Sequence, residues 1–442
     1  MMWSRQAAID ERHLRLAKGA LIALIATTSI FPLLFVTPDD GVALHVNVFK
    51  YLAKTGAFLG SMLLIWQFLL GFRGAVSSVI PDLSWVVSLH KGLGQFGVPI
   101  IVLHPVFIGL YYAEMHGTNI FALDLSRGFS VWVLLGMVAL ALVVFVIITS
   151  AFLRGKLGFY RWLCTHLSSY LIPPLLFTHS FLLGPTIQGT ALSVYWWFLT
   201  ALVLALFIYR VAHKLGISTR TYRVMQVETV AHETTEILME PEQRGLGPAP
   251  GQFIYLRESL TENSHPYTVS AFDDDRTLGV TVSVNGPQSA RLQETEIGDR
   301  LLLDGPFGVF TRPAAATDLP MVLIAGGVGI TAFRRLWQRL EHDRDREVHL
   351  FYGNETAPEI TYRDELDALE HVQVVHVLNQ EPEFDGETGF VTADVLRRNL
   401  PRDLGEYQYL LCGPPPMVVN LEEELLEEGV PASRLRHELF DS

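Results

Sequence analysis

The sequence predicts a multi-domain membrane protein, in which a six-helix transmembrane bundle precedes an antiparallel β domain and an α/β domain with a parallel sheet. Charge divides the chain: residues 1–213 carry 13 Lys and Arg against 7 Asp and Glu, whereas residues 214–442 carry 20 against 39. The first part contains long apolar runs, and the second alternates strand-like and helix-like patterns. With 50% hydrophobic and 18% charged residues, the chain is neither disordered nor a disulfide-stapled miniprotein.

Six stretches of the first part are long enough to cross a hydrocarbon core of about 30 Å, which takes about 20 apolar residues. Positive side chains gather before the first stretch, after the second, around the connection after the fourth, and after the sixth. The positive-inside rule therefore predicts a multi-pass protein of the cell membrane with both termini in the cytoplasm. Lys50 and Lys54 are exceptions. The stretches are 19–36, 51–72, 88–112, 130–153, 160–183 and 192–212.

Four histidines lie within these stretches, where ionisable side chains are costly and usually functional. His90 and His104 are 14 residues apart in the third stretch, and His166 and His179 are 13 apart in the fifth. Each pair spans roughly 20 Å at about 1.5 Å per residue, so one histidine lies near each membrane face. Both stretches run from inside to outside, which predicts that His90 meets His166 and that His104 meets His179.

Each predicted pair suits the ligation of one porphyrin iron through imidazole nitrogens. A single membrane histidine is more often a packed residue, and a proton or metal-ion pathway is the alternative for the set. On an ideal helix 14 residues return within about 40° of the start, whereas 13 end about 220° away. We expect Pro173 and Pro174, which lie between His166 and His179, to kink or rewind the fifth helix.

The second part changes rhythm near residues 311–320. Strand-length runs before this linker predict an antiparallel β domain, and apolar runs between helical patterns after it predict βαβ units with a parallel sheet. Its net acidity argues against nucleic-acid binding. Two cysteines, Cys164 and Cys412, form neither a disulfide framework nor a metal site by spacing.

Two motifs follow apolar strands of the last domain. Gly326, Gly327 and Gly329 precede a helix and allow a nucleotide to approach backbone amides, although a plain tight turn is an equally good interpretation. Cys412 begins the segment CGPPPM at the carboxyl edge of the sheet, where ligands of such folds bind. It could equally be a small buried core residue.

The segments HPYTVS at 265–270, AGGVGITAF at 325–333 and CGPPPM at 412–417 together resemble the ferredoxin-NADP reductase superfamily. With the four spaced histidines ahead of them, the whole chain resembles the ferric reductase and NADPH oxidase family of transmembrane flavocytochromes b. The resemblance implies a transmembrane domain with two haem b groups, a β-barrel that binds FAD, and an α/β domain that binds NADH or NADPH. The corresponding ranges are 1–213, 214–315 and 316–442.

The resemblance also implies residue roles. Tyr267 would lie against the flavin with Thr268 near its reactive nitrogen, and Cys412 would lie by the nicotinamide where hydride passes. The terminal RHELF implies that Phe440 covers the flavin until nicotinamide displaces it. Implied FAD contacts are His265, Pro266, Tyr267, Thr268, Ser270, Ser289, Gly305, Pro306 and Gly308. Implied nucleotide contacts are Gly326, Gly327, Gly329, Thr331, Cys412 and Gly413.

Three departures from the family pattern matter. Ala332 replaces a proline in the glycine turn. Glu355 stands after the strand HLFYGN, where it could accept a hydrogen bond from a ribose 2′-hydroxyl and thereby favour NADH. Arg363 or Arg334 could reverse that preference. Ile108 occupies the position of an additional histidine that the animal oxidases link to oxygen reduction.

We therefore predict an NAD(P)H-dependent flavohaem oxidoreductase. Electrons would pass from cytoplasmic NAD(P)H through FAD, an inner haem on His90 and His166, and an outer haem on His104 and His179, to an outside acceptor. A ferric chelate is the preferred acceptor, and reduction of oxygen to superoxide is the alternative. A histidine-lined ion or proton conduit regulated by the nucleotide-binding domain is a second class of function, and transfer to quinone or a partner protein is a third.

Overall fold

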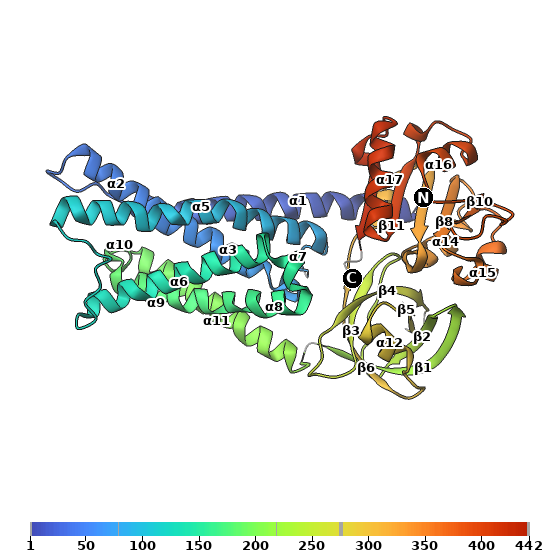
Figure 1. Ribbon diagram of the computed structural model, residues 1–442, viewed down its shortest axis with the longest axis horizontal. Helices are drawn as coiled ribbons and strands as arrows, with labels where there is room; N and C mark the ends of the chain where they lie inside the picture. Colours follow the sequence, from blue (N-terminus) through green and yellow to red (C-terminus); the bar gives the residue numbers. More distant parts are fainter. Residues whose placement is uncertain (1, 78, 218, 274–276, 440–442) are drawn as a thin grey trace. The chain divides into compact units, whose positions relative to one another are not determined.

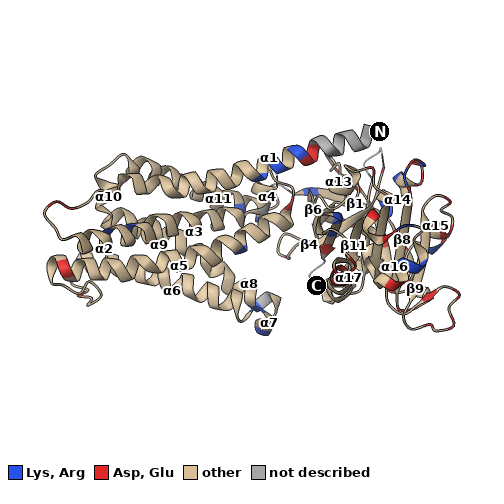
Figure 2. Cartoon of the chain, turned by 90° about the horizontal axis from the view of Figure 1, so that it is seen from above, with Lys and Arg blue, Asp and Glu red and all other residues tan. Residues whose placement is uncertain are grey.

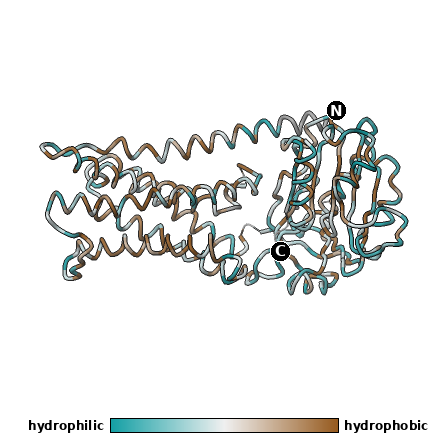
Figure 3. The backbone as a smooth tube through the Cα atoms, turned by 45° about the horizontal axis from the view of Figure 1, so that its top comes forward, coloured by the Kyte–Doolittle hydropathy of each residue, from teal (hydrophilic) through white to brown (hydrophobic). Residues whose placement is uncertain are grey.

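The computed structural model describes residues 2–77, 79–217, 219–273 and 277–439 (Figure 1). The chain separates into two compact units, one formed by Leu16–Val211 and the other by the remaining described residues. Lys, Arg, Asp and Glu are sparse along the helices of the first unit and frequent in the second (Figure 2). Hydrophobic residues predominate along the helices of the first unit (Figure 3). The predicted domain boundaries at residues 213 and 315 stay predictions.

Within the residues that the structure describes, five helical stretches are long and apolar enough to cross a bilayer. They match five of the six predicted spans, and the remaining span, 160–183, is helical but interrupted. The helices of this part are α1 Met2–Ile30, α2 Leu44–Thr55, α3 Ser61–Leu70, α4 Arg73–Val76, α5 Leu83–His116, α6 Gly128–Ala151, α7 Arg154–Leu157, α8 Phe159–Leu167, α9 Ile172–Leu183, α10 Pro185–Gln188 and α11 Leu192–Lys214.

Helix α5 begins and ends with clear capping signals. Asp82 is its N-cap, and its carboxylate accepts a hydrogen bond of 3.1 Å from the backbone N–H of Trp85. Gly117 ends the helix in the left-handed conformation at φ 61°, which glycine adopts without strain. The 34 residues between them carry both His90 and His104.

Two glycines bring α5 close to the second span. Gly56 and Gly60 bound a short π-helical turn, Gly56–Gly60, that joins α2 to α3. A Cβ atom at Gly60 would lie 2.8 Å from the Cα of Ile101, and one at Gly56 would overlap the backbone N of His104. Small residues permit such close backbone approach in membranes. These glycines therefore set the depth at which His104 lies beside α2.

Six antiparallel strands close into a barrel in the order β1-β2-β5-β4-β3-β6. Alternate residues fill its interior; Tyr222, Ile237 and Leu256 are fully buried there. The predicted antiparallel β domain is confirmed. Its elements are β1 Arg220–Ala231, β2 Thr234–Pro241, β3 Phe253–Arg257, β4 His265–Phe272, β5 Leu278–Ser283, α12 Pro287–Gln293 and β6 Arg300–Phe307.

The last part is a six-stranded parallel sheet in the order β10-β9-β8-β7-β11-β12. The central strand β7 is buried throughout because helices cover both faces, as is usual for parallel sheets. The strands are β7 Met321–Gly326, β8 Val348–Asn354, β9 Gln373–Leu378, β10 Glu387–Thr388, β11 Gln408–Gly413 and β12 Leu435–Leu439. The helices are α13 Arg312–Ala315, α14 Arg334–Leu340, α15 Arg363–Asp367, α16 Ala393–Asn399 and α17 Pro415–Glu427.

A buried polar network joins the barrel to this sheet domain. Arg334 at the start of α14 forms ion pairs with Glu236 on β2 at 2.5 Å and with Glu365 on α15 at 2.9 Å. Its guanidinium also lies 4.1 Å from the ring centre of Tyr362, whose hydroxyl is hydrogen-bonded to Thr281 on β5. The network therefore holds the two folds of the second unit against each other.

Candidate functional site

The structure brings together the four histidines in the pairs that the sequence predicted. His90 on α5 and His166 on α8 have ring centres 6.2 Å apart, with ring planes at 59°. His104 on α5 and His179 on α9 also have ring centres 6.2 Å apart, with planes at 79°. Helix α5 therefore supplies one histidine to each pair, and the interrupted span supplies the other.

The interruption explains how His166 and His179 reach one face. A 3-10 segment, Ser168–Leu171, separates α8 from α9, and Pro173 follows it in the first turn of α9. A 3-10 helix turns about 120° per residue instead of about 100°, so four such residues add roughly 80° of rotation. The offset of about 220° on an ideal helix becomes about 300°, within about 60° of alignment. The predicted rewinding is therefore present, immediately before the prolines.

Every ring in the two pairs has its Nδ1 atom engaged. Three Nδ1 atoms face main-chain carbonyls: His90 that of Gln67 at 2.7 Å, His104 that of Ala53 at 3.2 Å, and His179 that of Trp132 at 2.8 Å. His166 instead faces the hydroxyl of Ser150 at 3.1 Å. A carbonyl oxygen only accepts, so Nδ1 carries the proton in those three rings and Nε2 keeps its lone pair. Metal-bound histidines typically have this arrangement.

The spacing of the rings fits an ion between them. Imidazole–metal bonds of about 2.0–2.1 Å place the two nitrogen atoms roughly 4 Å apart across one ion. The half-widths of the two rings account for the remainder of the observed 6.2 Å. The ring spacing of both pairs therefore matches that of two imidazoles bound to one metal ion.

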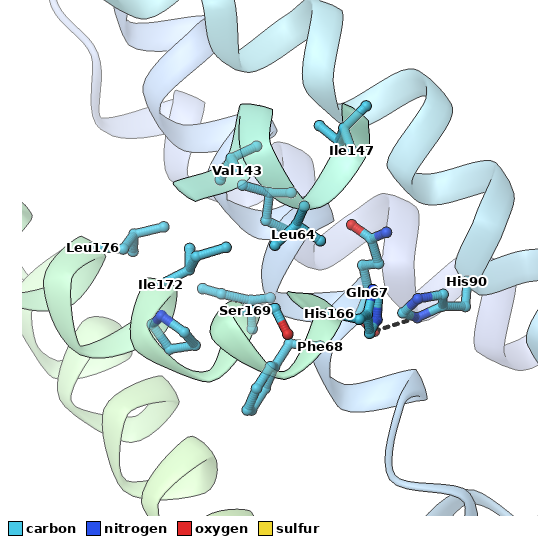
Figure 4. Close-up of a pocket in the computed structure, with 13 residues that line it drawn as sticks. Leu64, Gln67, Phe68, His90, Val143, Ile147, His166, Ser169, Ile172 and Leu176 are labelled. Atoms are coloured by element: carbon cyan, nitrogen blue, oxygen red, sulfur yellow. Dashed lines mark hydrogen bonds between the residues drawn. The ribbon is translucent and has the colours of Figure 1, made fainter. Parts of the chain in front are cut away.

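A cavity adjoins the inner pair (Figure 4). Its walls are mostly apolar side chains from α3, α6 and the interrupted span. His90 and His166 line the same cavity, and the dashed line in Figure 4 joins His90 to Gln67. A largely apolar lining with two imidazoles at its wall suits a planar cofactor such as a porphyrin.

The outer pair is closely packed by a glycine of α6. A Cβ atom at Gly136 would lie 2.5 Å from Cε1 and 2.6 Å from Nδ1 of His179. No real side chain tolerates such contacts, so only glycine lets the ring of His179 occupy its position. Three of the four Nδ1 partners are main-chain carbonyls, which have no residue signature, and neither Gly136 nor Ser150 belongs to a motif that would mark it in the sequence.

The strand β4 carries the residues that the sequence assigned to FAD. Thr268 is buried, and among the described residues no atom lies within hydrogen-bond distance of its Oγ1. Tyr267 is half-buried, and burial raises its pKa to about 12, so its phenol stays protonated. Burial lowers the pKa of His265, with a smaller contribution from Arg291. Pro266 is exposed. An unsatisfied buried hydroxyl fits the edge of a flavin.

Other predicted FAD residues have partners within the protein. Ser270 donates to Glu236 at 2.9 Å and accepts from Thr281 at 3.1 Å, so its hydroxyl belongs to the buried network between the two folds. Ser289 accepts from the backbone N–H of Asn285 at 2.7 Å and donates to the carbonyl of Gly286 at 3.1 Å. Their roles in cofactor binding stay predictions.

The turn that ends β6 combines two glycines with Pro306. Gly305 has φ +142° and Gly308 has φ +93°, backbone conformations that residues with a Cβ atom rarely adopt. The carbonyl of Gly308 accepts a hydrogen bond of 2.8 Å from the side chain of Gln252. The turn is thus anchored to the loop before β3, and its contact with FAD stays a prediction.

The two nucleotide motifs lie side by side, because β7 and β11 are neighbouring strands. A Cβ atom at Gly329 would lie 2.7 Å from the backbone C of Cys412, and one at Gly413 would lie 3.0 Å from the backbone N of Gly326. Gly327 has φ +53°. The predicted order of strand, glycine turn and helix is present: residues Gly327–Ala332 form a 3-10 turn after β7, and α14 starts at Arg334.

Cys412 and Thr331 are both buried at this edge. Burial raises the pKa of the Cys412 thiol well above its usual value, with a smaller contribution from Glu438, so the thiol stays neutral. Thr331 donates to the carbonyl of Val328 at 2.9 Å. A neutral thiol is compatible with a place beside nicotinamide and also with a core residue, so the role of Cys412 stays a prediction.

The residues expected to select the coenzyme differ in their partners and exposure. Glu355 follows β8 on an exposed turn, where its carboxylate accepts from Gln380 at 2.8 Å. Arg334 is committed to the network with Glu236 and Glu365. Arg363 is half exposed and lies 3.6 Å from Asp367. Arg334 is thus poorly placed to bind a 2′-phosphate. Phe440 lies outside the described residues.

Two family models match separate parts of the chain. The ferric reductase like transmembrane component matches residues 56–177, and the oxidoreductase NAD-binding domain matches residues 323–423. The first range contains all four paired histidines, and the second contains both nucleotide motifs.

Curated relatives match the second part of the chain. NADH-cytochrome b5 reductase 1 of Lodderomyces elongisporus is 36% identical over 169 residues, which are 35% of this chain and 56% of that protein. NADH–cytochrome b5 reductase 1 of Arabidopsis thaliana is 31% identical over 224 residues, 46% of this chain and 79% of that protein. The match thus spans just over half the length of the yeast relative and most of the plant one.

Two solved structures can be aligned with parts of the chain. The ferredoxin reductase of carbazole 1,9a-dioxygenase is 24% identical, with 51% of this chain and 70% of that chain covered at a TM-score of 0.45. A flavohemoglobin from Malassezia yamatoensis with bound FAD and heme is 18% identical, with 91% and 100% covered at a TM-score of 0.46.

Proposed function

The chain belongs to the ferric reductase and NADPH oxidase family of transmembrane oxidoreductases, and on this premise we propose that it moves electrons from cytoplasmic NAD(P)H to a chelated ferric ion across the membrane. The proposed cofactors are FAD and two b-type haems. We assign residues 1–213 to the haem domain, 214–315 to the FAD domain and 316–442 to the NAD(P)-binding domain, with both termini in the cytoplasm.

The proposal rests on the two histidine pairs, which have similar geometry. Both pairs have the same ring spacing of 6.2 Å, and all four rings have an engaged Nδ1, which leaves Nε2 to act as the ligand. Two such centres at different depths along α5 support a route across the bilayer. A proton relay through both ring nitrogens would need an Nδ1 atom that releases its proton, whereas the three Nδ1 atoms bonded to carbonyls are fixed donors.

When bound, FAD would convert the two-electron hydride of a nicotinamide into single electrons, and each haem would carry one electron at a time. The protein's own residues bind and orient these groups. Thr268 offers a buried hydroxyl with an unused hydrogen-bonding capacity to the flavin edge, and Tyr267 offers a protonated aromatic face. His90 and His166 would hold the inner haem, and His104 and His179 the outer one.

The glycines of the nucleotide edge permit close packing. Gly326, Gly329 and Gly413 are buried and let the ends of β7 and β11 approach each other, whereas Gly327 is only partly buried and would be the residue of the turn that a dinucleotide approaches. Cys412 contributes a neutral thiol, which is neither a nucleophile nor a charge beside a hydride donor. Glu355, exposed after β8, supports a preference for NADH through a ribose 2′-hydroxyl.

One residue of α5 supports the proposed acceptor. Ile108 stands one turn beyond His104, at the position where the animal oxidases have the histidine linked to oxygen reduction. An apolar side chain there cannot donate a hydrogen bond or a proton to reduced oxygen. This substitution favours a ferric chelate over oxygen as the acceptor.

Sealed vesicles of known orientation test the proposal. We expect NADH, added on the side of the termini, to reduce a ferric chelate trapped on the other side at a rate well above superoxide formation. A reduced-minus-oxidised spectrum of the purified protein should show b-type haem bands. If haem-replete membranes yield protein without such bands, electron transfer through these histidines is refuted and transport becomes the better interpretation.

A further inference from the structure

His166 differs from the other three paired histidines in what holds it. His90, His104 and His179 face main-chain carbonyls, which no side-chain substitution removes. His166 faces the hydroxyl of Ser150, a side chain on α6 at 3.1 Å. The orientation of one ligand in the inner pair thus depends on the identity of a second residue.

Ser150 has a second partner. The indole N–H of Trp162 on α8 donates to the same hydroxyl oxygen at 3.2 Å. The indole also lies against His166, with ring centres 5.2 Å apart and planes at 32°, and the guanidinium of Arg154 lies 4.9 Å from its ring centre. An indole nitrogen only donates, so the Ser150 oxygen accepts from Trp162 in every protonation state.

Ligation of a metal through Nε2 leaves the proton of His166 on Nδ1, so Ser150 then accepts from two donors at once. A hydroxyl oxygen is a weaker hydrogen-bond acceptor than an amide carbonyl oxygen, and this hydroxyl is also shared between two donors. A weaker bond at Nδ1 makes an imidazole a poorer electron donor to its metal, which favours the reduced state of the ion.

We propose that Ser150 and Trp162 are positioning residues that orient His166 and weaken its donation to the inner haem iron, so that the inner centre is more easily reduced than two carbonyl-anchored ligands would make it. This inference rests on the proposed function. It assigns the difference between the two haems to one hydroxyl and one indole on the cytoplasmic side of the bundle.

Redox titration of the purified full-length protein, with haem counted per chain, tests the assignment. The titration should show two reduction steps, or waves, one for each haem. Ser150→Ala removes the hydroxyl that faces Nδ1 of His166, so the wave of one haem should shift to a higher potential while the other stays in place. At a fixed solution potential, the ratio of ferrous to ferric haem should rise about tenfold, which corresponds to a shift of about 59 mV in the midpoint potential of a one-electron couple. Trp162→Phe frees Ser150 for His166 alone and should move the same wave in the opposite direction.

Two matched controls accompany these variants. Ser150→Thr keeps the hydroxyl and should leave both waves in place. Thr149→Val removes the neighbouring hydroxyl, which donates to the carbonyls of Phe145 and Val146 at 3.0 Å instead of facing a histidine. It should also move neither wave.

The outcomes separate the inference from the function on which it rests. Two bound haems with both waves unmoved in Ser150→Ala, or with both waves moved equally, would overturn the inference while leaving the haems in place. Unsubstituted protein without haem would overturn the proposed function itself. If Ser150→Ala loses a haem, retention by Ser150→Thr supports the positioning role, and loss in both contradicts it.

Discussion

The hydroxyl of Thr268 on β4 is the feature of this strand that points to cofactor binding. Most buried polar atoms in proteins have a partner, yet Thr268 Oγ1 has none among the described residues, while Ser270, two residues along the same strand, is fully engaged. The pairing register of β4 shifts between Val269 and Ala271, next to Ser270, so the difference between the two hydroxyls lies in what the tertiary structure places opposite each one.

We expect Thr268→Ala to weaken FAD binding by up to about tenfold and Thr268→Ser to restore it, since a neutral hydrogen bond contributes about 0.5–1.5 kcal/mol. Flavin fluorescence during titration of the cofactor-free protein measures the affinity. Equal affinities in the alanine and serine variants would show that the hydroxyl does not contact FAD.

His265 links the same strand to pH. Burial lowers its pKa in the folded protein, so the neutral ring is favoured and the stabilisation is present above its ordinary pKa of 6.5. That stabilisation is lost as the pH falls through the lowered value. We expect the fall in melting temperature between pH 7.5 and 5.5, measured by calorimetry, to be smaller in His265→Gln. Part of the fall should persist in this variant, because burial also lowers the pKa of His376. An unchanged pH slope would exclude the contribution of His265.

Helical elements of the membrane unit place the histidines through contacts that involve glycine. On α6, Gly136 leaves just enough room for the ring of His179. On α5, a Cβ atom at Gly92 would have open space around it, with no described atom within 4 Å, although Gly92 lies two residues from His90. Substitution by alanine would therefore crowd the ring of His179 at Gly136 but would place a methyl group in open space at Gly92.

Gly136→Ala should displace His179 and reduce bound haem from two per chain towards one, because overpacking costs about 1–3 kcal/mol and acts directly on a ligand. Gly92→Ala should retain both haems, since its methyl group meets open space. Haem per chain, measured from absorbance against protein concentration, decides the comparison. Full haem content in Gly136→Ala would contradict the role of His179 as a ligand at this position.

Across the second unit, the joint between barrel and sheet depends on one arginine. Arg334 is largely buried between Glu236 and Glu365, and removal of one partner from a buried ion pair typically costs about 3–5 kcal/mol. We expect Arg334→Ala to lower the free energy of unfolding by that amount in denaturant titrations. Arg344→Ala, which breaks the exposed pair with Glu370, should change it by less than about 1 kcal/mol. Equal effects of the two substitutions would show that the joint does not depend on Arg334.

Residue order alone was enough to predict the partition into a membrane part and a soluble part, the depth of the four histidines and the order of the flavin and nucleotide motifs. These are local properties, because hydrophobicity, charge and residue spacing are written along the chain. The spacing also indicated that the fifth span must be rewound between His166 and His179. It took the folded structure to reveal that a 3-10 segment does this, just before Pro173.

Which atoms hold each ring was settled by packing. The carbonyls of Gln67, Ala53 and Trp132 belong to the main chain, which every residue shares, so no pattern in the sequence could mark them. Ser270 belongs to the joint with Glu236 for a related reason: its partner is 34 residues away and meets it only when the barrel closes. Long-range contacts select among side chains that are locally equivalent.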